Sequence, residues 1–403
     1  MTTTVEEQKP EIRTPALRIQ IGVAFFAFIL IGANDAAIGV LIPSLRTQYS
    51  IDKATVGLLF FSAVLGYLIA AFNSGPLVAK LGIRSFLLLG VGSFLTGAIV
   101  LSTIPPFWLT LLMLLPLGFG AAILDAGLNS YIAGLPRNTA LLNYLHAFYG
   151  TGALLGPLVA STILAVGLTW NFVYVVWAVV SVVLVISVAV FFKSRKATTQ
   201  EGEAKTEKNV LAGALKRRVV WIAAFFLLFY VGTEVSLGNW SYSFLLEQRH
   251  GIPLISGWIV SGYWIGLTLG RLVLPHVAQR IGNKRLIQGC LFGVIVGTLI
   301  VWLVPFSSAA AVGLCFTGFC LGPIFPTTIA LMSHLVPSRL LASAIGFLAC
   351  LGNVGGALFP WLAGNIAQAV GLWSLLPYVI VLTIAMLLLW LMIQRQKPTL
   401  DTI

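Results

Sequence analysis

The amino-acid sequence predicts an all-α membrane protein with twelve transmembrane helices in two pseudo-symmetric six-helix bundles. Of its 403 residues, 59% are hydrophobic and only 9% are charged, whereas soluble domains carry about 25% charged residues. Apolar runs of about 20 residues, the length that crosses a bilayer as a helix, recur along the whole chain between short polar loops. Related residues also recur at an offset of 200 positions, which is typical of an internal duplication.

Twelve apolar runs are long enough to span a membrane, and several exceed that length, as tilted helices do. They lie near residues 18–45, 54–79, 84–103, 107–135, 140–166, 168–192, 218–247, 254–279, 285–305, 308–335, 339–367 and 371–393. The polar segment 193–217 is the one long loop and separates six runs from six. We therefore expect an N-terminal bundle over 1–192, a cytoplasmic linker over 193–217 and a C-terminal bundle over 218–403.

The internal repeat keeps one offset through the first four spans of each half. Ala24-Phe25-Phe26 recurs as Ala224-Phe225-Phe226, and Gly118-Phe119 recurs as Gly318-Phe319. The glycines with a partner 200 residues later include Gly32, Gly57, Gly66 and Gly82. A constant offset over several spans favours duplication over the chance matches of a glycine-rich chain.

The net charge of +12 follows the positive-inside rule, in which Lys and Arg gather on the cytoplasmic side. With a cytoplasmic N-terminus, only Arg46, Lys53 and Arg249 of the 24 basic residues fall outside, and Arg271 lies within a span. We therefore expect both termini to be cytoplasmic, in the plasma (inner) membrane, and no nucleic-acid partner. The first 17 residues are hydrophilic and predict no removable signal peptide.

Motifs of enzyme chemistry are missing from the sequence. It contains no Gly-x-Ser-x-Gly, Walker loop or His-Glu-x-x-His pattern, and its four cysteines lack metal-ligand spacing. We expect no enzymatic activity, no metal and no cofactor. Without an ATP site, any transport by this chain would draw its energy from an ion gradient or from the gradient of the transported substrate.

The span 107–135 carries one carboxylate, Asp125, within a narrow stripe of small and polar residues. Gly118, Ala122, Asp125 and Asn129 fall on one helical face. A charge in hydrocarbon costs about 2.5–3.5 kcal/mol on insertion scales, so such a group faces a wet cavity or a partner. We predict that Asp125 is the proton-handling group of a transporter.

Three other acids lie in or at the edge of spans: Asp35, Glu234 and Glu247. Glu234 is almost in register with Asn34 and Asp35 across the repeat. A transporter can use one carboxylate to carry the proton and another to bind the substrate. Asp35 can instead serve a structural role by forming a hydrogen bond with a neighbouring residue. Glu247 stands beside charged residues at the end of its span, where we expect a solvated helix end.

Two six-helix halves joined by a central loop resemble the major facilitator superfamily of transporters. The loop Gly75-Pro-Leu-Val-Ala-Lys80-Leu-Gly82-Ile-Arg84 resembles the superfamily's Gly-x-Leu-x-Asp-Arg-x-Gly-Arg-Arg motif, with Ala79 at the acidic position. The resemblance implies that Gly75, Lys80, Gly82 and Arg84 belong to a cytoplasmic gate. It also implies a substrate site near the bilayer midplane between the halves.

Details resemble the fucose and glucose proton symporters of that superfamily. Their fourth-span pattern, an acid followed by Ala-x-x-Asn, is matched from Asp125 to Asn129. Their first-span carboxylate falls at Gly39, whereas here Asp35 lies one turn earlier. Their fifth span opens with Asn-x-x-Gln-x-Phe, and here Asn143 is followed by His146 in place of the amide. Together with the acids in the spans, the resemblance leads us to expect proton coupling, or sodium coupling, through Asp125, Asp35, Glu234 and His146.

Recognition of a sugar requires amides or carboxylates for hydroxyls and flat aromatic faces for the ring. The candidate substrate residues are Asn34, Asn129, Asn143, Tyr149, Asn239, Trp240, Tyr263, Trp264 and Asn353. Tryptophan and tyrosine also gather at membrane interfaces, so Trp240 is equally an interface residue. Arg271 either pairs with an anionic substrate or extends toward the cytoplasm and braces the gate.

We therefore predict a monomeric secondary transporter that moves a small polar solute, in the first place a sugar, by proton-coupled alternating access. One alternative is proton-driven efflux of amphipathic or drug-like compounds, to which Gly152-Ala-Leu-Leu-Gly156-Pro157 is similar. A related motif around Gly352 in the second half favours helix packing for both. The other alternative is a membrane receptor that does not transport, in which Asp35 and Asp125 would be costly without purpose.

Overall fold

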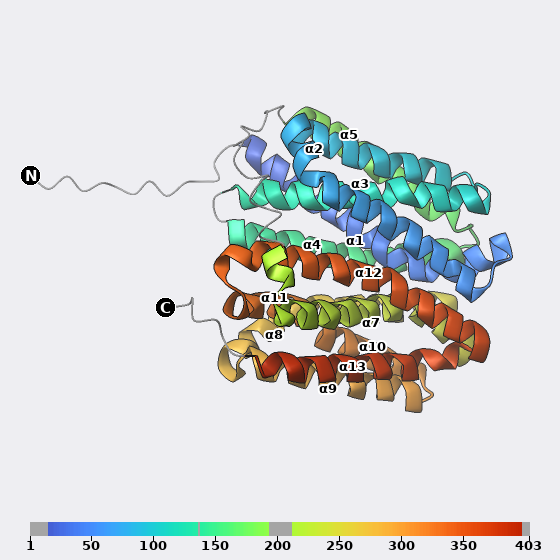
Figure 1. Ribbon diagram of the computed structural model, residues 1–403. Helices are drawn as coiled ribbons and strands as arrows, with labels where there is room; N and C mark the ends of the chain where they lie inside the picture. Colours follow the sequence, from blue (N-terminus) through green and yellow to red (C-terminus); the bar gives the residue numbers. More distant parts are fainter. Residues whose placement is uncertain (1–14, 136–137, 193–211, 397–403) are drawn as a thin grey trace, which may run out of the picture.

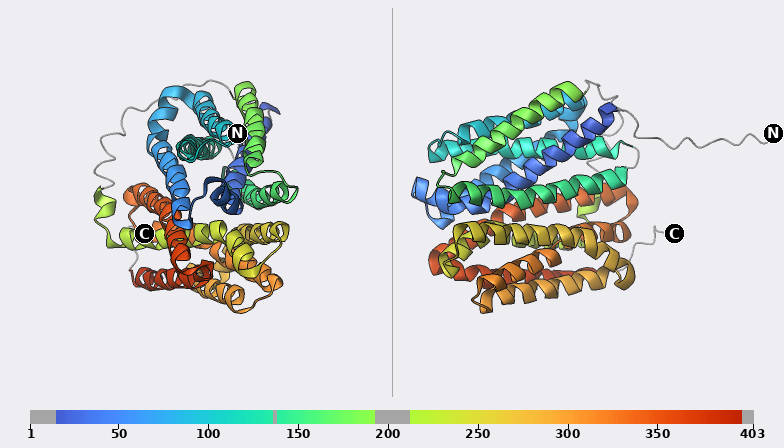
Figure 2. Two further views of the ribbon diagram at one scale, coloured as in Figure 1. Left: turned by 90° about the vertical axis from the view of Figure 1, so that its right-hand side faces the viewer. Right: turned by 180° about the vertical axis from the view of Figure 1, so that it is seen from behind.

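The computed structural model describes residues 15–135, 138–192 and 212–396. In this part of the chain the regular structure is helical and the helices run roughly parallel to one another (Figure 1). The helices of the first half lie together, and those of the second half form a second group beside them in both further views (Figure 2). The prediction of an all-α membrane protein is confirmed.

The helices of the first half are α1 Pro15–Tyr49, α2 Lys53–Leu101, α3 Phe107–Ala133, α4 Asn138–Ala165 and α5 Asn171–Phe191. Those of the second half are α7 Arg218–Arg249, α8 Pro253–Ile281, α9 Asn283–Leu303, α10 Ser307–Leu321, α11 Ile324–Leu335, α12 Ser338–Val370, the short 3₁₀ helix η1 Leu372–Ser374 and α13 Leu375–Gln394. Eleven segments of the described chain are long and apolar enough to cross a membrane, with α10 and α11 counted together.

Helix α2 contains two of the twelve predicted spans. Its 49 residues would extend about 70 Å at 1.5 Å per residue, more than twice the thickness of the hydrocarbon core. Gly82 has φ 73° and ψ 160° inside this helix, a backbone conformation that favours glycine. The bend at Gly82 separates the predicted spans 54–79 and 84–103 and gives twelve crossings in all.

The repeat inferred from the sequence is present in the helix contacts. Gly282 has φ 85° and ψ 149°, close to the conformation of Gly82. A Cβ at Gly66 would collide with the carbonyl oxygen of Leu115, and one at Gly266 would collide with that of Cys315, in each case 200 residues further on. These close backbone approaches require glycine and confirm a duplicated packing scheme.

The basic residues after the two bends also correspond. Arg84 donates to the carbonyl oxygen of Ala189 at 2.6 Å, and Lys284 donates to that of Gln394 at 3.2 Å. Both acceptors lie in the last turn of a helix, α5 and α13 respectively, where unpaired carbonyls attract cations. These contacts hold the last span of each half against its second and third spans.

The glycine-proline motif of α4 serves packing, as predicted. Added Cβ atoms at Gly152 and Gly156 would collide with the carbonyl oxygens of Ile29 and Ala33 on α1. The related motif on α12 brings Gly355 against the carbonyl oxygen of Leu228 on α7 in the same way. Small residues that allow such close approach are typical of helix pairs in membranes.

The two halves meet on one side of the membrane, at which α1 ends and α2 begins. We call this side the closed face. A Cβ at Gly39 would collide with the backbone of Asn239 on α7, and the backbone N–H of Lys53 donates to Oε1 of Gln368 on α12 at 3.0 Å. Helix α4 packs along α8 between the halves.

On the opposite side α2 bends at Gly82 and α8 meets α9. We call it the open face. There the hydrogen bonds and ion pairs between two described residues stay within one half, as between Tyr131 and Gln20 of the first half and between Trp221 and Leu215 of the second. The linker segment 193–211 lies outside the described residues, so the division into bundles over 1–192 and 218–403 stays a prediction.

Replacing Gly66 by alanine is expected to lower the melting temperature of the purified protein, because the new methyl group must displace the carbonyl oxygen of Leu115. Overpacking of this kind costs about 1–3 kcal/mol. The control is Gly92→Ala on the same helix, where an added Cβ meets no atom within 4 Å. Equal melting temperatures for the two variants would contradict the packing scheme.

Candidate functional site

Asp125 is held by two neighbours within the first half. Tyr67 of α2 donates to its Oδ2 at 3.0 Å, and Asn129, one turn later on α3, donates to its Oδ1 at 2.8 Å. The carboxyl group is only partly exposed. Two hydrogen bonds from neutral donors stabilise a carboxylate at this depth without an adjacent cation.

Asp35 occupies the middle of α1 and faces open space. Asn34 donates to its Oδ1 at 3.3 Å, and Tyr149 of α4 donates to its Oδ2 at 3.0 Å. Asp35 is nevertheless exposed, although residues on both sides of it in α1 are buried. An exposed carboxylate in the middle of a spanning helix needs water or a solute beside it.

The second half contributes an ion pair between Glu234 of α7 and Arg271 of α8. Arg271 Nη2 lies 3.2 Å from Glu234 Oε1, and the two side chains are 31% and 12% exposed respectively. Tyr263 donates to the backbone carbonyl oxygen of Glu234 at 2.9 Å and fixes the helices at this level. Arg271 is therefore oriented toward Glu234 and not toward the loop that follows α8.

These groups form one electrostatic network across the two halves. Tyr149, which holds Asp35, interacts with both Glu234 and Arg271. His146, one turn earlier on α4, interacts with Asp125 and with Arg271. The predicted coupling residues Asp125, Asp35, Glu234 and His146 are thus brought together, with Arg271 among them.

The network is accessible from the open face. His146 and Asn143 on α4 are exposed, as is Asp35. The hydrogen bonds between the halves in the described part of the chain, such as that from Ser261 to the carbonyl oxygen of Leu154, lie beyond this level toward the closed face. Solvent that reaches Asp35 therefore enters from the open face, and the structure is closed on one side and open on the other.

Glu247 is exposed near the end of α7, as predicted for a solvated helix end, but it also has ion-pair partners that were not predicted. Its Oε1 lies 3.0 Å from Arg46 Nη1 and its Oε2 lies 2.9 Å from Lys53 Nζ. The two cations belong to α1 and α2, and Glu247 belongs to α7. This carboxylate therefore joins the two halves at the closed face, and we call the three residues the closed-face bridge.

Asp52 lies close by but has a local role. Its side chain accepts from the backbone N–H of Thr55 at 2.7 Å as the N-cap of α2. Hydrogen bonding from the side chain and then from the backbone N–H of Thr55 holds the pKa of the Asp52 carboxyl below its ordinary value. Asp52 therefore provides an acid at the same face whose hydrogen bond stays within α2.

Five of the predicted substrate residues reach the exposed or half-exposed surface of the described chain. Asn34 and Tyr149 do so beside Asp35, Asn129 beside Asp125, Asn143 one turn before His146, and Asn353 on α12. Asn353 donates to the carbonyl oxygen of Ala349 of its own helix. The amides on α1, α3 and α4 are therefore the better candidates for contact with a solute.

The four substrate candidates on α7 and α8 are buried, which corrects their prediction for this conformation. Trp240 is fully buried and donates to the carbonyl oxygen of Pro360 at 2.8 Å, so it is neither a sugar platform nor an interface residue. Asn239 packs against Gly39, Tyr263 bonds the backbone of Glu234, and Trp264 lies against Gly238. These side chains pack α7 against its neighbours.

The predicted gate residues separate into three groups. Gly82 makes the bend and Arg84 bonds the end of α5, so both build the first half internally. Gly75 and Lys80 are exposed on the open face. Arg271 belongs to the central ion pair and not to this loop.

Two residues of the site were not predicted from the sequence. Tyr67 holds Asp125 from a neighbouring helix, and Tyr230, buried on α7, interacts with Glu234 and Arg271. Tyr67 is the one tyrosine of the run 54–79, whereas the run 218–247 contains both Tyr230 and Tyr242, so the sequence offers little to single out either residue of the site. The significance of a tyrosine depends on the rotation of the helix, which the hydrophobic pattern does not fix when the helix is apolar all round.

The Major Facilitator Superfamily model matches the chain over residues 24–256 and 231–402. A protein of Saccharomyces cerevisiae named Bypass of stop codon protein 6 is 28% identical, with 89% of this chain and 79% of that protein covered. The glucose/mannose transporter GlcP of Bacillus subtilis is 25% identical, with 90% and 89% covered. The crystal structure of the nucleoside transporter NupG superposes with a TM-score of 0.77 at 15% identity and covers 95% of this chain and 100% of that chain.

Replacing Glu247 by glutamine is expected to shift the protein toward opening at the closed face, because it removes both ion pairs that join the halves there. Partly exposed pairs contribute about 0.2–1 kcal/mol each, so loss of both pairs is expected to increase opening about 2- to 30-fold. The measurement is the rate at which a membrane-impermeant maleimide labels Asn239→Cys, in a background without the four native cysteines.

The matched control is Asp52→Asn, which alters an acid of the same face whose hydrogen bond stays within α2. It is expected to leave the labelling rate unchanged. A Glu247→Gln rate equal to that of the control would show that the closed-face bridge does not hold this face shut.

Proposed function

Because the chain belongs to the major facilitator superfamily and is a multi-pass membrane transporter of small molecules, not an enzyme, we propose that it couples protons to the movement of a neutral, hydroxyl-rich solute such as a sugar. The observation that carries the proposal is the pair of carboxyl groups in the first half. Asp35 is exposed in the middle of a spanning helix, and Asp125 lies behind it within electrostatic reach.

The two carboxyl groups suit different tasks. Asp35 faces the open space and adjoins the half-exposed Asn34 and Tyr149, so we assign it to the hydroxyl groups of the solute. Asp125 is bonded only within the first half, by Tyr67 and Asn129, so we assign it to the proton. His146 interacts with Asp125 from the exposed side and provides a group through which the proton can enter.

The ion pair in the second half favours a neutral substrate. Arg271 lies within α8 at the level of the site, and Glu234 neutralises it. The unpaired charges that remain near the site are the carboxyl groups of Asp35 and Asp125. An anionic solute would meet repulsion there, whereas hydroxyl groups can donate hydrogen bonds to carboxylates.

The similarity to a relative named a glucose/mannose transporter supports the same class of substrate. In the proposed cycle, protonation neutralises Asp125 and lowers the cost of reorienting the loaded carrier. The positive-inside bias supports a cytoplasmic open face with both termini on that side, in the plasma membrane. Each chain contains both halves of the site, which supports function as a monomer.

Proton-driven efflux of amphipathic cations is the second candidate, because an exposed carboxylate such as Asp35 also attracts a cation. The two candidates differ in the direction of proton movement. In vesicles, addition of a transported sugar is expected to move protons with the solute, whereas an exported cation would move them in the opposite direction.

Replacing Asp125 by asparagine is expected to preserve solute exchange across vesicles and to abolish accumulation driven by a pH gradient. The amide keeps the size of the side chain but cannot bind and release a proton. The measurement compares counterflow with gradient-driven uptake of a radiolabelled hexose. Asp52→Asn, at the closed face, is the control and is expected to retain both activities. Accumulation by the Asp125→Asn protein at the wild-type level would remove this residue from the role.

Replacing Glu234 by glutamine is expected to change the substrate preference toward anions, because it leaves Arg271 unpaired. It is also expected to destabilise the protein by about 2 kcal/mol, below the 3–5 kcal/mol for breaking a fully buried pair, because this pair is partly exposed. A thermal-shift comparison of glucose with glucuronate measures both effects, since stabilisation by a ligand follows its occupancy.

The double variant Glu234→Gln with Arg271→Gln removes both charges and serves as the control. It is expected to melt at a higher temperature than Glu234→Gln alone and to show no preference for glucuronate. A Glu234→Gln protein that still binds only neutral sugars would contradict the proposed role of the ion pair in setting substrate charge.

A further inference from the structure

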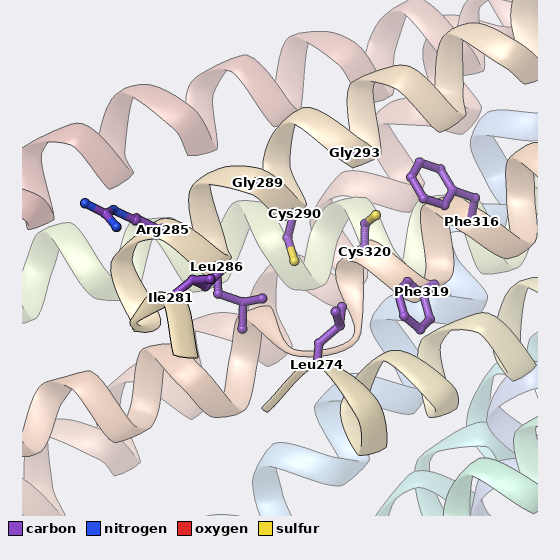
Figure 3. A pocket seen from close by; sticks show the side chains of 10 residues that line it. All are labelled: Leu274, Ile281, Arg285, Leu286, Gly289, Cys290, Gly293, Phe316, Phe319 and Cys320. Carbon is purple, nitrogen blue, oxygen red and sulfur yellow. The ribbon is translucent and has the colours of Figure 1, made fainter. Parts of the chain in front are cut away.

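A groove lies on the membrane-facing side of the second half, between α8, α9 and α10, away from the central site. It has a volume of about 200 Å³, less than the roughly 300–1,000 Å³ of pockets that enclose drug-sized ligands. Figure 3 shows Arg285 at one end and Phe316 near the other, with the sulfur atoms of Cys290 and Cys320 between them. Exposure of Ile281 and Phe316 opens the groove toward the lipid.

One face of α9 gives the groove its polarity. Arg285, Gly289 and Gly293 follow at intervals of four residues and therefore lie along one side of the helix. At 1.5 Å per residue, Gly293 lies about 12 Å deeper in the membrane than Arg285. The groove thus places a cation at the level of the lipid headgroups and a shallow apolar floor at the level of the acyl chains.

The cation is not neutralised by the described part of the protein. Arg280, Lys284 and Arg285 are exposed at the α8–α9 junction, and none of the ion pairs of the described residues includes them. The described carboxylates lie at the central site or at the closed face: Asp35, Asp52, Asp125, Glu234 and Glu247. Three neighbouring cations at the membrane surface attract anionic headgroups.

The other half of the repeat lacks this combination. At an offset of 200 residues, Ser85 corresponds to Arg285 and the exposed Leu89 corresponds to Gly289. The fold therefore requires neither a basic residue nor a glycine at these positions. Both features occur together only in the second half, where they line the same groove.

We propose that this groove binds an anionic phospholipid, with the headgroup phosphate at Arg285 and one acyl chain over Gly289 and Gly293. The apolar lining, which includes Leu274, Leu286 and Phe319, accommodates the chain, and the uncompensated cation selects the headgroup. The open-face leaflet supplies the lipid, which is the cytoplasmic leaflet in the orientation proposed above. Binding at this site does not depend on the identity of the transported solute.

The test is native mass spectrometry of the full chain with equal amounts of phosphatidylglycerol and phosphatidylcholine. The unmodified protein is expected to retain phosphatidylglycerol preferentially. Arg285→Gln is expected to reduce that preference about fivefold, the effect of one basic residue at a membrane surface. Gly289→Leu is expected to reduce retention of both lipids, because its side chain occupies the groove.

Gly92→Leu is the matched control, because added Cβ atoms at Gly92 and Gly289 alike meet no atom within 4 Å. All variants are expected to melt near the wild-type temperature, so a loss of lipid is not a loss of folding. Any one of three results would overturn the proposed lipid site. These are equal retention of both lipids by the unmodified protein, an unchanged preference for phosphatidylglycerol in Arg285→Gln, and identical lipid retention by Gly289→Leu and Gly92→Leu.

Discussion

A charged side chain in the hydrocarbon core of a membrane costs about 2.5–3.5 kcal/mol, and this protein places four of them near the middle of its spans. The second half meets the cost by pairing Glu234 with Arg271. Among the described residues of the first half, no cation forms an ion pair with its two acids, which are instead held by neutral donors: Tyr67 and Asn129 for Asp125, and Tyr149 for Asp35. The donors leave Asp35 in contact with open space, so that solvent or solute must complete its surroundings.

The repeat explains how such groups can be held without filling the space between them. Glycines at corresponding positions let α2 approach α3 and α8 approach α10 backbone to backbone. Each half is therefore packed internally by contacts that need no large side chains at its inner surface. The charged and aromatic side chains are free to differ between halves, which they do: Tyr67 corresponds to Leu267, and Asp125 to Phe325.

The sequence was sufficient for the number of spans, the repeat and the residues that carry the unusual charges. Hydropathy and offsets depend on the order of residues alone, and a carboxylate in an apolar run is conspicuous wherever it points. The partners of those charges were not predicted. Arg271 was expected to meet a substrate or the gate, and no ion-pair partner was predicted for Glu247, because neither helix rotation nor the approach of α7 to α1 and α8 can be read from one sequence. Trp240 was misassigned for the same reason, since an aromatic residue near the end of a span can face lipid, a cavity or a neighbouring helix.

The first span departs from the sugar-symporter pattern at Gly39, where that pattern has a carboxylate, and the contact between α1 and α7 explains why. A carboxylate there would match the first-span pattern of the sugar symporters that the chain resembles, but Gly39 lies against the backbone of Gly238 and Asn239 at the closed face. No side chain fits between α1 and α7 at that level while the closed face is shut. One turn closer to the open face the helices have separated enough for Asp35 to be exposed and to reach Tyr149. The carboxylate can therefore face the solute path at the position of Asp35 and not at that of Gly39, because the closed-face bridge and the glycine contact beside it occupy the space beyond.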